Sequence, residues 1–154
     1  MRLITDTLVA LMLVGLVAGV VVYQHRKRDL EQRVQTTRAA VERFQSQINL
    51  QAAMEKVTLT QRGYPQTVKL EWFDGDLPGN SLLGETYPWV EIASSSRRDR
   101  LHPVNRMATT HEVAQFWYNP YTGVVRARVP DSVSDATALR LYNRVNSSDL
   151  GRIE

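Results

Sequence analysis

The sequence contains no cysteine, which excludes disulfides, thiolate metal ligands and cysteine nucleophiles. It also lacks the GxSxG, P-loop and GxGxxG patterns of common catalytic and nucleotide-binding sites. The 3 histidines show neither an HxxxH nor an HExxH spacing, so a metal site would need ligands from scattered positions. These absences predict a protein that is not an enzyme and needs no cofactor.

Positive charge is concentrated in the N-terminal part of the chain. Residues 1–57 carry 8 Lys and Arg against 5 Asp and Glu, whereas residues 58–154 carry 11 of each. The formal net charge of +3 therefore belongs to the first part. A nucleic-acid-binding domain needs clustered basic residues on the folded domain itself, so we expect no nucleic-acid partner.

One long apolar run stands near the N-terminus. Counted from Leu3 to Tyr23 it has 21 residues, about 31 Å of helix, which matches a hydrocarbon core of about 30 Å. Basic residues follow the run, with no small-x-small cleavage site, and this favours a retained anchor over a cleaved signal. The sequence predicts a transmembrane helix over residues 1–23, with the lipid bilayer as a partner, in a single-pass protein of the cell inner membrane.

Three residues of this run are candidates for packing and assembly. Gly15 and Gly19 have the GxxxG spacing that lets a second helix approach closely. Asp6 is the one carboxylate in the run, and two interpretations remain open for it. It begins the helix, where the helix N-terminus favours negative charge, or it pairs with a cation.

The helix is expected to continue beyond the apolar run, because neither Gly nor Pro occurs between Val20 and Arg62. Apolar or small residues recur there with spacings of 4, 3, 4, 3 and 4, which is typical of an amphipathic helix. They are Leu30, Val34, Thr37, Val41, Phe44 and Ile48. We predict an amphipathic stalk helix over residues 24–57, continuous with the first. Packing of Val34, Val41, Phe44 and Ile48 on the chain's own distal domain is favoured over a coiled coil, although the two can coexist.

Residues 58–154 are predicted to form a domain built on an antiparallel sheet. The expected strands cover residues 57–60, 67–73, 87–93, 114–118 and 124–129. The last two flank an Asn-Pro-Tyr-Thr-Gly turn and form a hairpin, in which Arg126 and Arg128 alternate with apolar residues and should face water. Residues 74–85 and 93–110 are expected to be loops. Residues 136–145 favour a helix, with Ser132 or Ser134 as its N-cap.

One segment has part of the spacing of a calcium loop. Asp74, Asp76 and Glu85 occupy its first, third and twelfth positions, with Gly79 at the sixth. Pro78 stands at the fifth position, where an oxygen ligand is expected, and no helix pair flanks the segment. We therefore predict a plain turn and no bound metal, with calcium as the weaker alternative.

The N-terminal residues resemble those of type IV pilins and of the pseudopilins of type II secretion. Residues 2–6, Arg-Leu-Ile-Thr-Asp, are similar to the family's Phe-Thr-Leu-Ile-Glu opening, and residues 8–22 are similar to the apolar run that follows it. The match is partial, because the family's helix-kinking proline is absent and no basic leader ending in glycine precedes the run.

The resemblance implies an α+β fold in which a long N-terminal helix, transmembrane and then amphipathic, packs on a small antiparallel sheet. It implies a non-catalytic structural or assembly subunit of a secretion or pilus-type system, which associates with itself or with other pilin-like subunits. Asp6 would then pair with the N-terminal amine of a neighbour, and residues 58–154 would lie on the periplasmic side. The basic residues 26–28 after the run favour the cytoplasmic side instead, by the positive-inside rule. The alternative is a bitopic inner-membrane scaffold that binds another membrane protein through its stalk helix.

Overall fold

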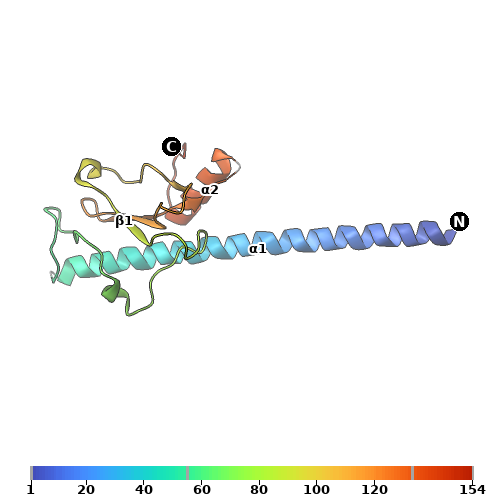
Figure 1. Cartoon of the computed structure of the whole chain (residues 1–154), viewed down its shortest axis with the longest axis horizontal. Helices are drawn as coiled ribbons and strands as arrows, with labels where there is room; N and C mark the ends of the chain where they lie inside the picture. The colour runs from blue at the N-terminus through green and yellow to red at the C-terminus, as the bar shows by residue number, and fades with distance from the viewer. Residues whose placement is uncertain (1, 55, 133, 154) are drawn as a thin grey trace. The chain divides into compact units, whose positions relative to one another are not determined.

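The computed structural model describes residues 2–54, 56–132 and 134–153, with side chains from residue 11 onward. The chain divides into two compact units, an N-terminal unit of residues 1–33 and a C-terminal unit of residues 34–154. Helix α1 (Arg2–Met54) supplies the N-terminal unit and the first part of the C-terminal one (Figure 1). The protein is thus α+β, with a long N-terminal helix followed by a small sheet and a second helix.

The prediction of a transmembrane helix over residues 1–23 is wrong. Over the part of the chain that the structure describes, no helix combines the length and the apolar character that a membrane span requires. The prediction of a single-pass protein of the inner membrane is wrong for the same reason.

The main sheet is mixed, which corrects the prediction of an antiparallel one. Strand β3 (Phe116–Asn119) is central, parallel to β1 (Val90–Ile92) on one side and antiparallel to β4 (Val124–Ala127) on the other. A parallel pair needs a long connection, and residues 93–115 supply it between β1 and β3. Within that connection β2 (Met107–Ala108) pairs in parallel with β5 (Val129–Pro130).

The predicted hairpin of β3 and β4 is present. Its turn is closed by hydrogen bonds from the N–H groups of Thr122 and Gly123 to the carbonyl of Asn119, at 3.2 and 2.8 Å. Gly123 has a φ of 71°, a left-handed conformation that favours glycine. A Cβ at Gly123 would lie 2.3 Å from the Tyr64 ring, so the turn also depends on close packing.

Two predicted strands are absent from the described segments. In residues 57–60, Leu59 makes only an isolated bridge to Pro65, because a tight turn closes there through a bond from Thr60 N–H to the Tyr64 carbonyl. Within residues 67–73 the chain forms a 3₁₀ helix, η1 (Leu70–Phe73), which ends where Asp74 takes a left-handed conformation. A second 3₁₀ helix, η2 (Ser95–Arg97), interrupts the expected loop 93–110.

The expected C-terminal helix is found as α2 (Asp135–Asn146). The Ser134 hydroxyl accepts a bond from the Thr137 N–H at 3.3 Å and caps the first turn. Ser147 takes a left-handed conformation with a φ of 48° and ends the helix. Ala138, Tyr142 and Val145 of α2 are buried in the core of the C-terminal unit.

The core lies between one face of the main sheet and the buried side of residues 34–48 of α1. Phe44 is fully buried, with its ring stacked on Trp89 at 5.1 Å and edge-on to Phe116 at 5.7 Å. Val34, Val41 and Ile48 are also buried in this cluster. Because complete burial of such a side chain contributes about 1.5–3 kcal/mol, this stripe holds α1 on the rest of the unit.

The opposite face of the sheet is covered by the connection that contains η2. Trp117 points to that face and is fully buried. The Asn119 amide donates to the carbonyls of Arg97, Arg98 and Arg100, and this fixes the connection over the sheet. The prediction that Arg128 faces water is therefore wrong, because its side chain is 2% exposed.

Candidate functional site

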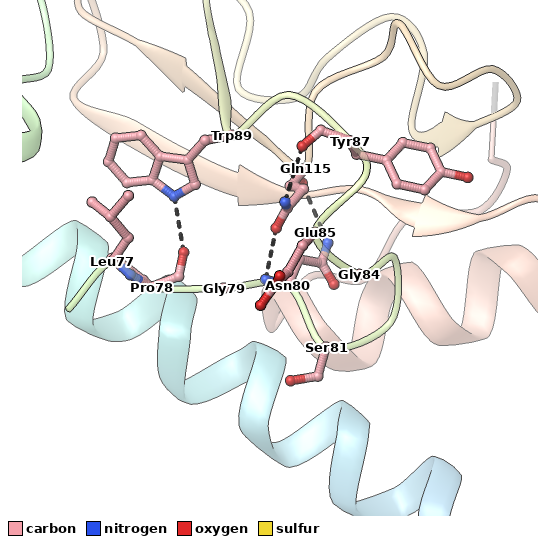
Figure 2. Close-up of a pocket in the computed structure, with 10 residues that line it drawn as sticks. All are labelled: Leu77, Pro78, Gly79, Asn80, Ser81, Gly84, Glu85, Tyr87, Trp89 and Gln115. Atoms are coloured by element: carbon pink, nitrogen blue, oxygen red, sulfur yellow. Dashed lines mark hydrogen bonds between the residues drawn. The ribbon is translucent and has the colours of Figure 1, made fainter. Parts of the chain in front are cut away.

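One groove of the C-terminal unit lies where residues 77–87 pass the start of β1. It has a volume of about 540 Å³ (Figure 2). Hydrogen bonds hold its walls: Trp89 Nε1 donates to the Pro78 carbonyl at 2.8 Å, and Gln115 Nε2 donates to the Tyr87 carbonyl at 3.1 Å. The lining residues are Leu77, Pro78, Gly79, Asn80, Ser81, Gly84, Glu85, Tyr87, Trp89 and Gln115.

Asn80 anchors this groove from inside the protein. Its side chain is 2% exposed, and its Nδ2 donates to the carbonyls of Arg128 at 2.7 Å and Gln115 at 3.3 Å. Its Oδ1 accepts from the Leu82 N–H at 3.1 Å and the Thr37 hydroxyl at 3.3 Å. Because both ends of the amide are occupied, Asn80 serves the fold and has no capacity left for a ligand.

The groove offers an apolar surface and few reactive groups. Leu77 and the rings of Tyr87 and Trp89 form its walls, and Glu85 is the one carboxylate among its lining residues. The Oε1 of Gln115 accepts the Asn80 N–H at 2.9 Å, so this amide is also used internally. Such a lining can hold an apolar side chain, but its described residues do not pair a nucleophile with a base.

The structure does not bring the three calcium-loop residues together. Asp74 follows η1, and Asp76 Oδ2 accepts from Arg43 Nη1 at 2.6 Å, whereas Glu85 lies at the rim of the groove. Within residues 11–54, 56–132 and 134–153, no group of three or more His, Cys, Asp or Glu side chains is arranged to hold a metal ion.

The candidate assembly residues lie in the N-terminal unit. Gly15 and Gly19 are exposed, and a Cβ added at either one would meet nothing within 4 Å. The side chain of Asp6 lies outside the described residues. The stalk residues Val34, Phe44 and Ile48 are no more than 1% exposed, and Val41 is 8% exposed, so they pack within the C-terminal unit.

An ion pair between the buried guanidinium of Arg128 and the half-exposed carboxylate of Glu91 is the main polar feature that the sequence did not predict. Arg128 Nη2 donates to Glu91 Oε2, and its Nε and Nη1 donate to the carbonyls of Asn105 and Ala114. Glu91 also accepts from Arg97 at 3.3 Å. The one signal for it in the sequence was the length of the expected loop 93–110, because a connecting segment runs over the surface of its domain and one this long can cover a face of the sheet.

His102 lies beside two guanidinium groups and a buried phenol. Its Nδ1 is 3.0 Å from the Tyr142 hydroxyl. Burial, followed by the positive charges of Arg126 and Arg106, lowers the pKa of His102 to about 4. Burial raises the pKa of Tyr142, so both groups are neutral near pH 7.

Comparison of the chain with protein-family models, with curated proteins and with solved structures finds no match to any of them. The resemblance of residues 2–22 to pilins and pseudopilins stays a prediction from the sequence.

Proposed function

We propose that this protein is a non-catalytic, pilin-like structural subunit of a secretion or pilus-type assembly. It packs laterally against further copies of itself, or against similar subunits, through residues 11–23 of α1, here called the apolar segment. Gly15 and Gly19 lie within this segment, and Asp6, which precedes it in the sequence, takes part in the same contact.

Exposure of the apolar segment is the observation that carries the proposal. Its large apolar side chains are between 51% and 68% exposed. They are Leu11, Met12, Leu13, Val14, Leu16, Val17, Val20, Val21, Val22 and Tyr23. Contiguous apolar surface of this kind marks an interaction site, and each side chain that becomes buried contributes about 1.5–3 kcal/mol.

The pattern of this exposure favours several neighbours over one. Apolar residues occupy consecutive positions of the helix, so they point in every direction around its axis. A helix that is apolar all round requires cover on all sides, which one partner helix cannot supply. Repeated lateral packing of identical subunits supplies it.

Two further features support a structural role. The stripe of Val34, Val41, Phe44 and Ile48 packs in the core of the C-terminal unit and has no surface to offer a second subunit. Self-association is therefore expected through the apolar segment. The groove next to β1 uses its amides in internal hydrogen bonds, which favours a structural role over catalysis.

Disulfide cross-linking tests the proposal, because the natural chain has no cysteine. Gly15→Cys introduces a thiol where there is open space, and we expect disulfide-linked dimers on mild oxidation. Gly151→Cys, at an exposed glycine of the C-terminal unit, is the matched control and should remain monomeric. A cysteine at Val34 would not report on subunit contacts, because this position is 1% exposed. A Gly15→Cys protein that stays monomeric at every concentration and oxidant level contradicts lateral packing through this segment.

A further inference from the structure

The two edges of the main sheet differ in how their backbone groups are satisfied. The edge at β4 is closed by side-chain amides. Gln45 donates to the Gly123 carbonyl at 2.7 Å and accepts from the Val125 N–H at 3.0 Å. The Asn146 amide accepts from the Ala127 N–H at 2.7 Å and donates to the carbonyl of the same residue at 2.9 Å. These amides take the place of a neighbouring strand, so β4 cannot accept another one.

In the part of the chain that the structure describes, the edge at β1 has no such cover. Bonds from Phe116 N–H to the Trp89 carbonyl and from Ala93 N–H to the Tyr118 carbonyl show that alternate residues of β1 face β3. Val90 and Ile92 therefore direct their N–H and carbonyl groups away from the sheet. Among the described residues, none donates to or accepts from these four groups. Ile92 is 37% exposed, and Val90 is half-buried.

A groove of about 530 Å³ lies beside the C-terminal end of this edge. Ile92 and Ala93 line one side of it, and the turn around Thr60 forms the other side. That turn is held in place by a hydrogen bond from the Thr60 hydroxyl to the Pro120 carbonyl at 2.9 Å. The groove is therefore built into the fold, and its volume is within the range of binding pockets, about 300–1,000 Å³.

The chemistry of the groove indicates what it can bind. Its walls carry neutral amide and hydroxyl groups from Gln61, Gln66 and Thr67, which suit the backbone and polar side chains of a peptide. Nine of its ten lining residues carry no charge, and the one cation among them, Arg98, is 3.5 Å from Asp99, which it shares with Arg62.

We infer that β1 is a docking site for an extended, uncharged polypeptide segment of a partner protein, which adds to the main sheet as a further strand. Its backbone pairs with the N–H and carbonyl groups of Val90 and Ile92, and its alternate side chains enter the groove. The inference rests on the edge of β1 and does not depend on the proposed assembly through the apolar segment.

The probe is a fluorescent peptide of alternating threonine and valine with a lysine at each end, titrated with the full-length protein. Binding is followed by fluorescence anisotropy. The same peptide, N-methylated at alternate residues, keeps its side chains but loses the donors that strand pairing needs. We expect measurable binding of the first peptide and at least about tenfold weaker binding of the second.

Two protein variants locate the site. Ile92→Pro removes an N–H that faces away from β3, so it leaves the β1–β3 bonds in place and should weaken binding about tenfold. Ile92→Thr keeps that N–H and is the matched control, with binding within about threefold of the natural protein. Equal binding of both peptides, equal binding to Ile92→Pro, or no binding at about 1 mM protein would overturn the inference.

Discussion

Asn80 provides the sharpest test of how the C-terminal unit is held together. The N–H of Gln115 is bonded to the Pro88 carbonyl, so the Arg128 carbonyl next to it receives its bond from Asn80 Nδ2. Replacing Asn80 with Ala leaves that carbonyl and the Leu82 N–H without their partners. Each buried group that loses its bond costs about 1–3 kcal/mol. Because the Leu82 N–H is only partly buried, we expect a loss of about 3 kcal/mol in the free energy of unfolding.

Asn80→Asp distinguishes loss of the donor from loss of packing. The aspartate has nearly the same shape, but its carboxylate would face the Arg128 carbonyl with an oxygen instead of an N–H. At pH 7 this variant should be at least as destabilised as Asn80→Ala. At lower pH the buried carboxyl becomes protonated and can donate, so Asn80→Asp should regain stability relative to Asn80→Ala.

The assay is urea unfolding followed by the fluorescence of the tryptophans, of which Trp117 is fully buried. Asn49→Ala is the control, because Asn49 is exposed and its Oδ1 accepts from the Gln45 side chain at 3.4 Å. It should change the free energy of unfolding by less than about 0.5 kcal/mol. If Asn80→Ala behaves like Asn49→Ala, or if Asn80→Asp and Asn80→Ala respond identically to pH, Asn80 does not have this role.

Three further predictions concern the same unit. Phe44→Ala removes a fully buried ring and should lower the free energy of unfolding by about 3–5 kcal/mol in urea titrations. A loss below about 1 kcal/mol would mean that the buried side chains of residues 34–48 do not hold α1 on the rest of the unit. Gly123→Ala puts a side chain on a left-handed residue, against the Tyr64 ring, and should lower the free energy of unfolding by about 2–4 kcal/mol. Gly151→Ala, where space is open, should be nearly neutral, and similar melting temperatures for the two variants would contradict the turn geometry. His102 has a folded-state pKa of about 4, so the unfolded chain binds more protons below about pH 6.5, and stability is lost as the pH falls from 6.5 towards 4. Allowing for partial exposure, we expect a loss of about 1 kcal/mol between pH 6.5 and 5, which is absent in His102→Asn; equal pH dependence of the two proteins would show that another group is responsible.

Sequence patterns were sufficient to predict the elements that depend on one helix face or on one turn. The 4-and-3 spacing from Val34 to Ile48 and the Asn-Pro-Tyr-Thr-Gly turn of the hairpin are local patterns, and α1 and β3–β4 follow them. The parallel pairing of β1 with β3 depends on how residues 93–115 return over the sheet, and no local pattern specifies that path. The burial of Arg128 follows from the same path, because its partners Asn105 and Ala114 lie on that connection.

The candidate sites differ in the same way. Gly15 and Gly19 have open space around them, and the helix packing that their spacing predicts stays a prediction. The spacing of Asp74, Asp76 and Glu85 fits part of a calcium loop, but the three residues have different surroundings in the structure. Asp74 ends the 3₁₀ helix η1, Asp76 pairs with Arg43, and Glu85 lines the groove beside β1. The closed edge at β4 depends on Gln45 and Asn146, which are 101 positions apart in the numbering, and no sequence pattern indicates that they act together.

Sedimentation velocity of the full-length protein tests the central claim, assembly through the apolar segment, most directly. Leu16→Glu places a charge at a leucine that is 67% exposed within the segment, and Leu101→Glu does the same at a leucine that is 54% exposed in the C-terminal unit. We predict that the natural protein and Leu101→Glu sediment as oligomers over the same concentration range, whereas Leu16→Glu shifts to the monomer. A natural protein that sediments as a monomer throughout, or a Leu16→Glu variant that remains as oligomeric as Leu101→Glu, would contradict the account.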